Sequence, residues 1–165
     1  MDKHDRTPLK RLSLADPLQL LAVGFGSGLL PKMPGTYGSL AALPLCAALL
    51  YLPLYVTLPF IALFLVLGFI AADRAEKALG MHDNSAIVVD EFAGMFISCL
   101  LYPPQWWWCL PAFVLFRIFD ILKPFPIGFI DRRLGGGLGV MADDVVAGIY
   151  AMIAGRLFVY LVSGV

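Results

Sequence analysis

Long uncharged stretches separated by short charged clusters are the main pattern in this chain of 165 residues. No Asp, Glu, Lys or Arg lies between Lys32 and Asp73, and none lies between Glu91 and Arg117. A helix needs about 20 apolar residues to cross a bilayer, so the first stretch has room for two tightly joined helices. The pattern predicts helices packed in a membrane.

Prolines, glycines and capping residues divide these stretches into elements. Pro53 and Pro59 flank one turn, and Pro103–Pro104 marks another. Leu18–Leu30 is apolar and rich in glycine but too short to span, which predicts an interfacial or re-entrant segment. Longer helices are predicted near Ser39–Tyr51, Pro59–Leu79, from caps at His82–Ser85 to about Tyr102, from Trp106 to the charges at Arg117, and, after a glycine-rich loop at Gly135–Gly139, from Asp143–Asp144 to the C-terminus.

Composition supports the same class. The hydrophobic fraction is 60%, the charged fraction is 15% and the mean hydropathy is +0.83. Soluble domains carry more charge and less apolar sequence. We therefore predict an all-α, multi-span membrane helical bundle with about four transmembrane helices plus the glycine-rich interfacial or re-entrant segment. Residues 1–12 form a polar N-terminal arm, and residues 13–165 form a single membrane-embedded domain.

Lys and Arg mark one side of the predicted bundle. They occur in the N-terminal arm and at Lys32, Arg74, Lys77 and Arg117–Arg133. Counting helical hairpins places all of these on one side, which the excess of positive charge marks as cytoplasmic. The uncharged aromatic turn Tyr102–Trp108 fits the opposite interface. Arg156 is the exception, and it either extends to the opposite headgroups or forms an internal ion pair.

Several other classes of protein are disfavoured. A formal net charge of zero and the lack of a basic stripe argue against nucleic acid as a partner. Gly24–Gly28 lacks the full spacing of a dinucleotide-binding loop. The three cysteines lie in apolar runs, which predicts buried thiols rather than a disulfide framework. No small-residue cleavage site follows the N-terminal charges, so we expect no cleavable signal peptide.

Five carboxylates are expected at helix ends on the cytoplasmic face, with three cations among them. The carboxylates are Asp90, Glu91, Asp120, Asp143 and Asp144, and the cations are Lys32, Arg117 and Lys123. Carboxylates crowded at a low-dielectric boundary repel one another unless cations lie between them. Hard oxygen ligands favour Mg²⁺, whereas two histidines are too few for a typical zinc site. The alternative is an interfacial network in which Arg and Lys alone balance the acids.

Arg117, Asp120 and Lys123 share one face of a helix because they are spaced at i, i+3 and i+6. Pro124 then stops that helix, since proline has no backbone N–H to donate. Charge at the end of an apolar helix marks a candidate functional site.

The turn Pro31–Ser39 opens the first long apolar helix. It carries Lys32, the hydroxyl groups of Thr36 and Ser39, and free backbone N–H groups. These features fit an anion-binding site, and they equally fit a simple cap and turn before a membrane helix.

Acids, Mg²⁺ and cations at headgroup level are suited to phosphoryl transfer from an anionic lipid. A cysteine nucleophile would need Cys five residues before Arg, but Cys109 precedes Arg117 by eight. A histidine nucleophile would need two embedded histidines, and His4 lies in the polar arm. The Asp-x-Asp pattern of aspartyl-phosphate enzymes is absent. Attack by an activated water remains.

Four ordered blocks of the chain resemble the phosphatidylglycerophosphatase A family. The blocks are Pro34–Ser39, Ile87–Gly94, Phe116–Ile127 and Gly139–Gly148. The resemblance implies a Mg²⁺-dependent phosphatase of the bacterial inner (cytoplasmic) membrane that removes the terminal phosphate of phosphatidylglycerophosphate, an anionic phospholipid, to give phosphatidylglycerol. Residues 13–165 would then form the phosphatase domain.

We combine this expectation with the charge pattern to predict roles, with the site facing the cytoplasm. The predicted catalytic residues are Asp90, Glu91, Asp120, Asp143 and Asp144. The predicted Mg²⁺ ligands are Asp90, Glu91, Asp120 and Asp144. The predicted phosphate-binding residues are Lys32, Thr36, Ser39, Arg117 and Lys123.

Two other functions stay open at this point. A metal-dependent phospholipid phosphotransferase would use an Asp-x-x-Asp-Gly-x-x-Ala-Arg pattern, which this sequence lacks. A small ion-coupled transporter would place charges near the bilayer midplane, whereas here they are predicted at one face except for Arg156.

Overall fold

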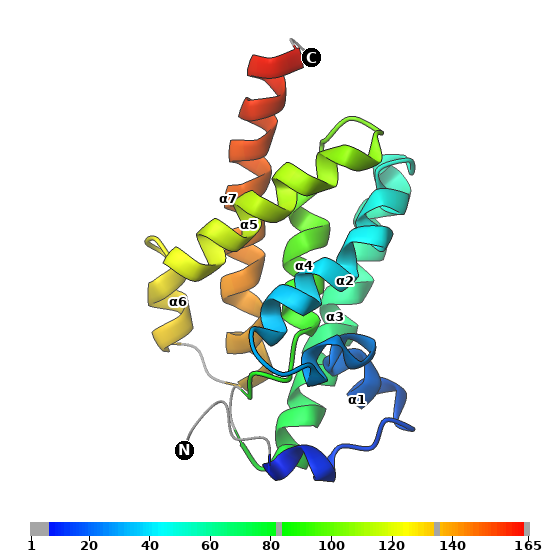
Figure 1. Ribbon diagram of the computed structural model, residues 1–165, viewed down its shortest axis with the longest axis vertical. Coiled ribbons are helices and arrows are strands. Elements are labelled where there is room, and N and C mark those ends of the chain that lie inside the picture. The colour runs from blue at the N-terminus through cyan, green and yellow to red at the C-terminus, as the bar shows by residue number, and fades with distance from the viewer. Residues whose placement is uncertain (1–6, 82–83, 134–135, 164–165) are drawn as a thin grey trace.

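The computed structural model describes residues 7–81, 84–133 and 136–163, and over these ranges the chain is helical without strands, as predicted (Figure 1). His82 and Asp83, which we expected to cap the third helix, lie outside the described residues, as do residues 1–6 of the predicted arm. The elements are η1 (Thr7–Arg11), α1 (Pro17–Ala22), η2 (Gly24–Leu29), α2 (Pro34–Leu49), α3 (Leu54–Leu79), α4 (Val89–Ser98), η3 (Trp106–Trp108), α5 (Cys109–Leu122), α6 (Ile127–Arg133) and α7 (Gly136–Ser163).

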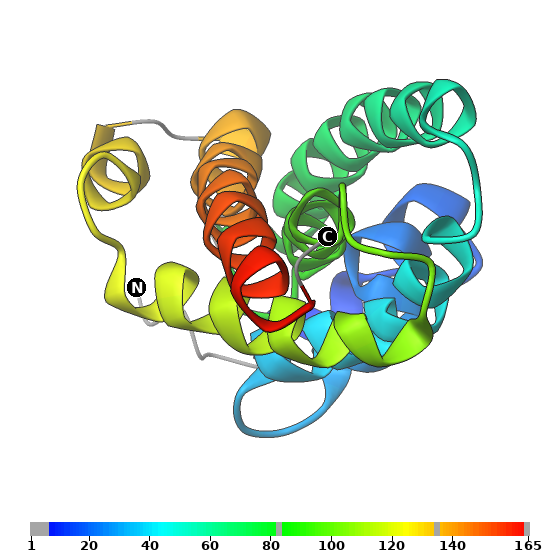
Figure 2. The ribbon, with the colours of Figure 1, turned by 90° about the horizontal axis from the view of Figure 1, so that it is seen from above.

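Helix α4 lies at the centre of the bundle, in contact with α2, α3, α5 and α7 (Figures 1 and 2). Every α4 residue except Asp90 is buried. The backbones of α4 and α7 approach closely, because a Cβ atom built on Gly148 would lie 3.2 Å from Gly94 Cα. Glycine at such a crossing lets two helices pack backbone to backbone. The middle of α4 is therefore held against the middle of α7.

The expectation of about four membrane spans was wrong. Among the described residues, two helices, α3 and α7, are long and apolar enough to cross a membrane, over 26 residues each. By contrast α4 has 10 residues, which is about 15 Å of helix against a hydrocarbon core of about 30 Å. Its uncharged sequence reflects burial inside the protein. Apolar residues are needed equally against protein and against lipid, so hydropathy did not separate the two cases.

Helix α4 starts later than predicted because residues 84–88 form hydrogen bonds outside a helix. The Val88 N–H donates to the Ala22 carbonyl at 2.8 Å, which ties this segment to α1. Asn84 accepts hydrogen bonds from the N–H groups of Ala86 and Ile87 at 3.0 and 2.9 Å. These contacts satisfy the backbone without a helix.

Two other predicted boundaries also differ. Helix α7 begins at Gly136, so Gly136–Gly139 is helical and Asp143–Asp144 lies two turns inside the helix rather than at its start. Helix α2 begins at Pro34, so Pro34–Ser39 forms its first turns instead of a preceding turn. Both shifts move predicted site residues onto rigid helices.

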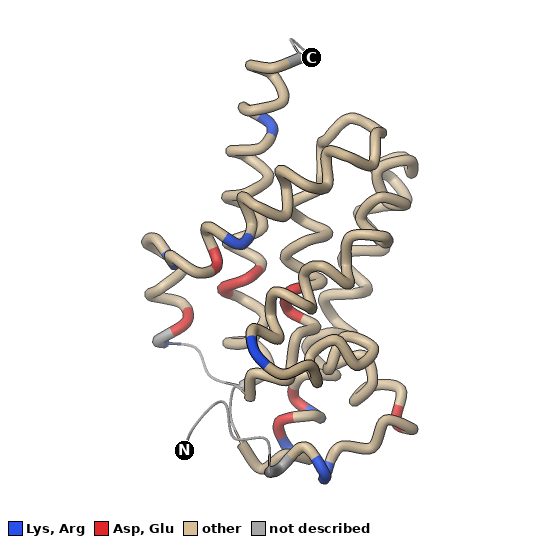
Figure 3. The backbone as a smooth tube through the Cα atoms, viewed as in Figure 1, with Lys and Arg blue, Asp and Glu red and all other residues tan. Residues whose placement is uncertain are grey.

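Charged residues gather in one half of the molecule (Figure 3). Helices α3 and α7 pass into the uncharged half, where they expose most of their apolar residues: only 22% and 28% of their most apolar windows are buried. Arg156 is the exception, as predicted, and its Nη1 donates to the Leu101 carbonyl at 3.4 Å. At the charged end, Arg74 pairs with Asp16 at 2.7 Å and fixes the N-terminal elements to α3. Two long apolar helices with charge at one end are consistent with membrane association.

Candidate active site

Glu91, Arg117 and Ser39 meet from three different helices, α4, α5 and α2. Arg117 Nη1 lies 2.6 Å from Glu91 Oε2 and 3.3 Å from Ser39 Oγ. The Ser39 hydroxyl lies 2.9 Å from Glu91 Oε2 and is fully buried. Residues that lie 78 positions apart in sequence thus form one buried polar cluster. Ion pairs out of water need additional hydrogen bonds of this kind to offset desolvation.

The same Arg117 nitrogen also contacts Asp120, one helical turn away, at 2.9 Å. The side chains of Arg117 and Asp120 are only 15% and 14% exposed, so solvent does little to screen this contact. One guanidinium nitrogen therefore bridges two carboxylates. Arg117 Nε is buried and has no hydrogen-bond partner in the described part of the chain, which leaves a donor of the guanidinium fork available.

Asp144, on α7, completes a group of three carboxylates with Glu91 and Asp120. One oxygen from each lies within 4.8 Å of the others. Asp144 Oδ2 is buried and accepts no hydrogen bond from the residues that the structure describes. A buried carboxylate oxygen without a donor is costly, and a hard cation would satisfy it. The donor set, three carboxylates from three helices, fits Mg²⁺ on its chemistry.

The start of α2 packs directly on this cluster. A Cβ atom on Gly35 would overlap Glu91 Oε1 and would lie 3.3 Å from Arg117 Nη1. Only glycine leaves room for the acids here. Ser39, one turn later, also bonds to the Gly35 carbonyl at 2.9 Å. The block that resembled a phosphate-binding turn is therefore a helix start that touches the acidic cluster.

Lys32 and Thr36 are not drawn into the cluster. Lys32 precedes α2, is exposed, and has no ion pair with any described residue. Thr36 is half-buried in the first turn of α2. Of the five predicted phosphate-binding residues, the structure brings Ser39 and Arg117 to the group formed by Glu91, Asp120 and Asp144.

Lys123 belongs to a second cluster beside the first. It ends α5 with φ 43°, in the left-handed region, and its Nζ lies 2.7 Å from both Asp131 and Asp143. Burial opposes the charge of Lys123, but these two carboxylates outweigh it and raise the pKa of the ammonium group above its ordinary value. Lys123 thus carries its charge between α6 and α7.

Asp131 was missed from the sequence. It lies in the charged segment after Pro126, on a different helix from the one that Lys123 ends, and a turn at residues 124–126 separates the two helices. The only signal was an acid within a basic run. The contact depends on α6 folding back toward α7, which periodicity does not predict.

Asp90 and Asp143 lie next to the three-carboxylate group rather than within it. Asp90 Oδ1 accepts from the Glu91 N–H at 2.9 Å. Asp143 is held by Lys123. Adjacent residues on a helix point about 100° apart, which explains why one acid of each pair faces the cluster and its neighbour does not.

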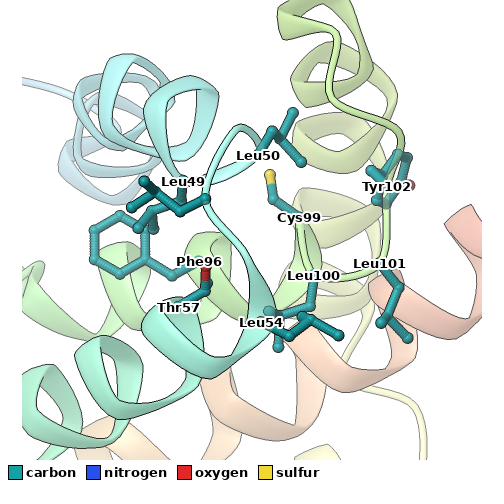
Figure 4. Close-up of a pocket in the computed structure, with 10 residues that line it drawn as sticks. Leu49, Leu50, Leu54, Thr57, Phe96, Cys99, Leu100, Leu101 and Tyr102 are labelled. Carbon is teal, nitrogen blue, oxygen red and sulfur yellow. The ribbon is translucent and has the colours of Figure 1, made fainter.

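A separate apolar cavity of about 230 Å³ opens at the other end of α4 (Figure 4). Leu49, Thr57, Phe96 and Cys99 are among the side chains that line it. None of the predicted site residues contributes to it.

Comparison with known proteins gives the same family as the sequence blocks. The family model described as phosphatidylglycerophosphatase A matches residues 20–159. The chain belongs to the phosphatidylglycerophosphatase A family. All five carboxylates and both Arg117 and Lys123 lie inside the matched region.

Relatives of known name match over most of the chain. A Haemophilus influenzae protein named phosphatidylglycerophosphatase A is 50% identical over 151 residues, covering 90% of this chain and 93% of its own. The Escherichia coli protein of the same name is 42% identical over 159 residues, covering 96% and 91%. A Bacteroides thetaiotaomicron protein with the provisional name phosphatidylinositol-3-phosphatase is 42% identical over 142 residues, covering 81% and 88%. No solved structure gave a significant match.

Proposed function

We propose that this protein hydrolyses the terminal phosphate monoester of phosphatidylglycerophosphate to give phosphatidylglycerol, and that Mg²⁺ bound by Glu91, Asp120 and Asp144 assists the reaction. Family membership supports the lipid phosphatase activity. The observation that carries the metal proposal is the approach of three carboxylate oxygens from three helices to within 4.8 Å, one of them buried without a donor. Bound there, Mg²⁺ would supply positive charge to the phosphate oxygens as negative charge builds up.

The chain's own residues would bind and orient the phosphate. Arg117 is held by Glu91 and Asp120 through Nη1, so its position is fixed while Nε remains free to donate to a phosphate oxygen. Ser39 stands within hydrogen-bond reach of Arg117 and can rotate its hydroxyl toward the same oxygen. Exposed Lys32 would attract the anionic headgroup to this end of the molecule.

We assign Asp90 as the base that takes a proton from the attacking water. Asp143 is bonded to Lys123, which stabilises its ionised form and weakens it as a base. Asp90 has no cationic partner among the described residues, and it is half-buried beside the cluster. Attack by the water in line with the ester oxygen would then break the bond between phosphorus and that oxygen and release phosphate, and the leaving oxygen would take up a proton from solvent to give the lipid hydroxyl.

The direct test is phosphate release by the purified protein in detergent. Phosphatidylglycerophosphate with Mg²⁺ should yield phosphate and phosphatidylglycerol, identified by mass. Phosphatidylinositol 3-phosphate serves as a second substrate, because one relative carries the name of a phosphatase acting on it. No phosphate release from phosphatidylglycerophosphate would refute the proposed activity, and faster hydrolysis of phosphatidylinositol 3-phosphate would transfer it to that lipid.

We also propose that the site faces the cytoplasm in a bacterial inner membrane. The described Lys and Arg residues other than Arg156 share the end of the molecule that carries the acidic clusters, and positive charge favours the cytoplasmic side. Lys77, with a side chain 75% exposed, lies at that end, whereas Gln105 lies in the aromatic turn at the other.

Thiol labelling of cells tests the orientation. In a variant with Cys46, Cys99 and Cys109 replaced by alanine, Lys77→Cys should react with a membrane-impermeant reagent only after the cells are opened. Gln105→Cys should react in intact cells. The reverse pattern would invert the topology.

A further inference from the structure

We propose that Asp131 is a positioning residue: through Lys123 it fixes Asp143, and with it the part of α7 that presents Asp144 to the acidic cluster. This inference rests on the proposed function, because it concerns how the same site is held. Asp131 does not contact Glu91, Asp120 or Asp144, so any effect on catalysis has to pass through its partner.

One ammonium group joins three helices here. Lys123 Nζ lies 2.7 Å from Asp131 Oδ1 on α6 and 2.7 Å from Asp143 Oδ2 on α7, and Lys123 itself ends α5. The left-handed conformation of Lys123 turns the chain out of α5 at this residue. Without one of the two carboxylates, the ammonium group would no longer be fixed between α6 and α7 and could move with the remaining carboxylate, since a lysine side chain has many rotamers.

Helix α6 is placed to hold Asp131 in this position. Ile127 and Asp131 are four residues apart and share a face, and Ile127 is fully buried. Gly128 lies against the Lys123 carbonyl, where an added Cβ atom would come within 2.8 Å of the oxygen. One apolar contact and one charged contact, one turn apart, therefore seat α6 against α7 and the end of α5.

The bridge has a short path to the proposed metal ligands. Asp143 is 9% exposed in its side chain and is followed directly by Asp144, whose oxygen approaches Glu91 and Asp120. Both acids sit on one rigid helix that is packed backbone to backbone on α4 at Gly94 and Gly148. A small rotation of α7 that reorients the Asp143 side chain would also move the Asp144 carboxylate, because both residues belong to the same rigid helix.

The test compares steady-state kinetics of Asp131→Asn, Asp131→Glu, Lys123→Met and the double variant Asp131→Asn/Lys123→Met. Asp131→Asn should lower kcat by about tenfold with little change in KM, because partners that orient a ligand typically matter by that much. Asp131→Glu should recover part of kcat. The double variant should be no slower than Lys123→Met alone, since Asp131 acts through Lys123. Asp73→Asn, which removes an exposed carboxylate paired with Lys77, is the matched control and should keep full activity.

Three outcomes would overturn the proposal: Asp131→Asn as active as Asp73→Asn, a raised KM with unchanged kcat, or fully additive losses in the double variant. Thermal unfolding of the same four variants without substrate gives a second readout. The midpoint shifts of Asp131→Asn and Lys123→Met should be non-additive, and additive shifts would again refute the bridge. An inactive wild-type protein with non-additive shifts would refute the proposed function and leave the bridge standing.

Discussion

Asp120→Asn is expected to abolish phosphate release from phosphatidylglycerophosphate while the protein remains folded and extractable. Asparagine keeps the size of the side chain but removes the negative charge that faces Glu91 and Asp144. A bound metal supplies several kcal/mol of transition-state stabilisation, so its loss corresponds to roughly 10³-fold or more in rate. Asp120 also pairs with Arg117 at 2.9 Å, so the same change loosens the phosphate-binding guanidinium.

Chelation tests the loss of the metal by itself, because EDTA removes the metal and leaves the contact between Asp120 and Arg117 in place. EDTA should stop the wild-type enzyme, and added Mg²⁺ should restore it, whereas Asp120→Asn should stay inactive at any Mg²⁺ concentration that the lipid tolerates. Asp73→Asn removes a carboxylate from the exposed pair with Lys77 and should leave both the rate and the Mg²⁺ dependence unchanged. Full activity in EDTA would eliminate the metal proposal.

Arg117→Lys is expected to lower kcat/KM by at least about tenfold. Lysine keeps the positive charge but offers one nitrogen, which cannot take the place of both Nη1, between Glu91 and Asp120, and Nε, the proposed donor to phosphate. Hydrogen bonds to charged groups contribute about 1.5–3 kcal/mol each, and tenfold corresponds to about 1.4 kcal/mol. The shorter reach of a single ammonium also leaves one carboxylate without its partner in a buried place.

Arg74→Lys is the matched control for that change. Arg74 is 57% exposed and pairs with Asp16 at a distance from the acidic cluster, so the replacement should leave kcat/KM unaltered. A near-normal rate for Arg117→Lys would mean that Arg117 only balances the charge of the acids. That outcome would support the alternative interpretation from the sequence, in which Arg and Lys alone balance the charge of the acids.

The local pattern of charges was readable from the chain. Arg117 and Asp120 were expected on one helix face, and they form an ion pair there. Gly94 and Gly148 meet where α4 and α7 approach closely. Both results follow from helical spacing, which relates residues within one element, or from residue size, which limits how near two elements come.

The number of membrane spans could not be obtained in the same way. The uncharged sequence runs that contain most of α4 and most of α3 look alike. In the structure, however, α4 is surrounded by protein, whereas α3 exposes most of its apolar side chains. The free energy of moving an apolar side chain out of water is nearly the same for both surroundings. Only the packing of α2, α5 and α7 around α4 decides which environment each run occupies.

The sequence by itself determined the helical class, the family, the acids and cations available for chemistry, and the end of the molecule at which they gather. The tertiary structure decided which of them lie together. Of the five candidate acids, Glu91, Asp120 and Asp144 lie within 4.8 Å of one another. Ser39 contacts Arg117, which is 78 residues away in sequence, and Asp131 contacts Lys123. The physical reason is that a carboxylate gains a partner only through three-dimensional proximity, and proximity between helices depends on where each begins, how closely its neighbours pack, and how the chain turns between them.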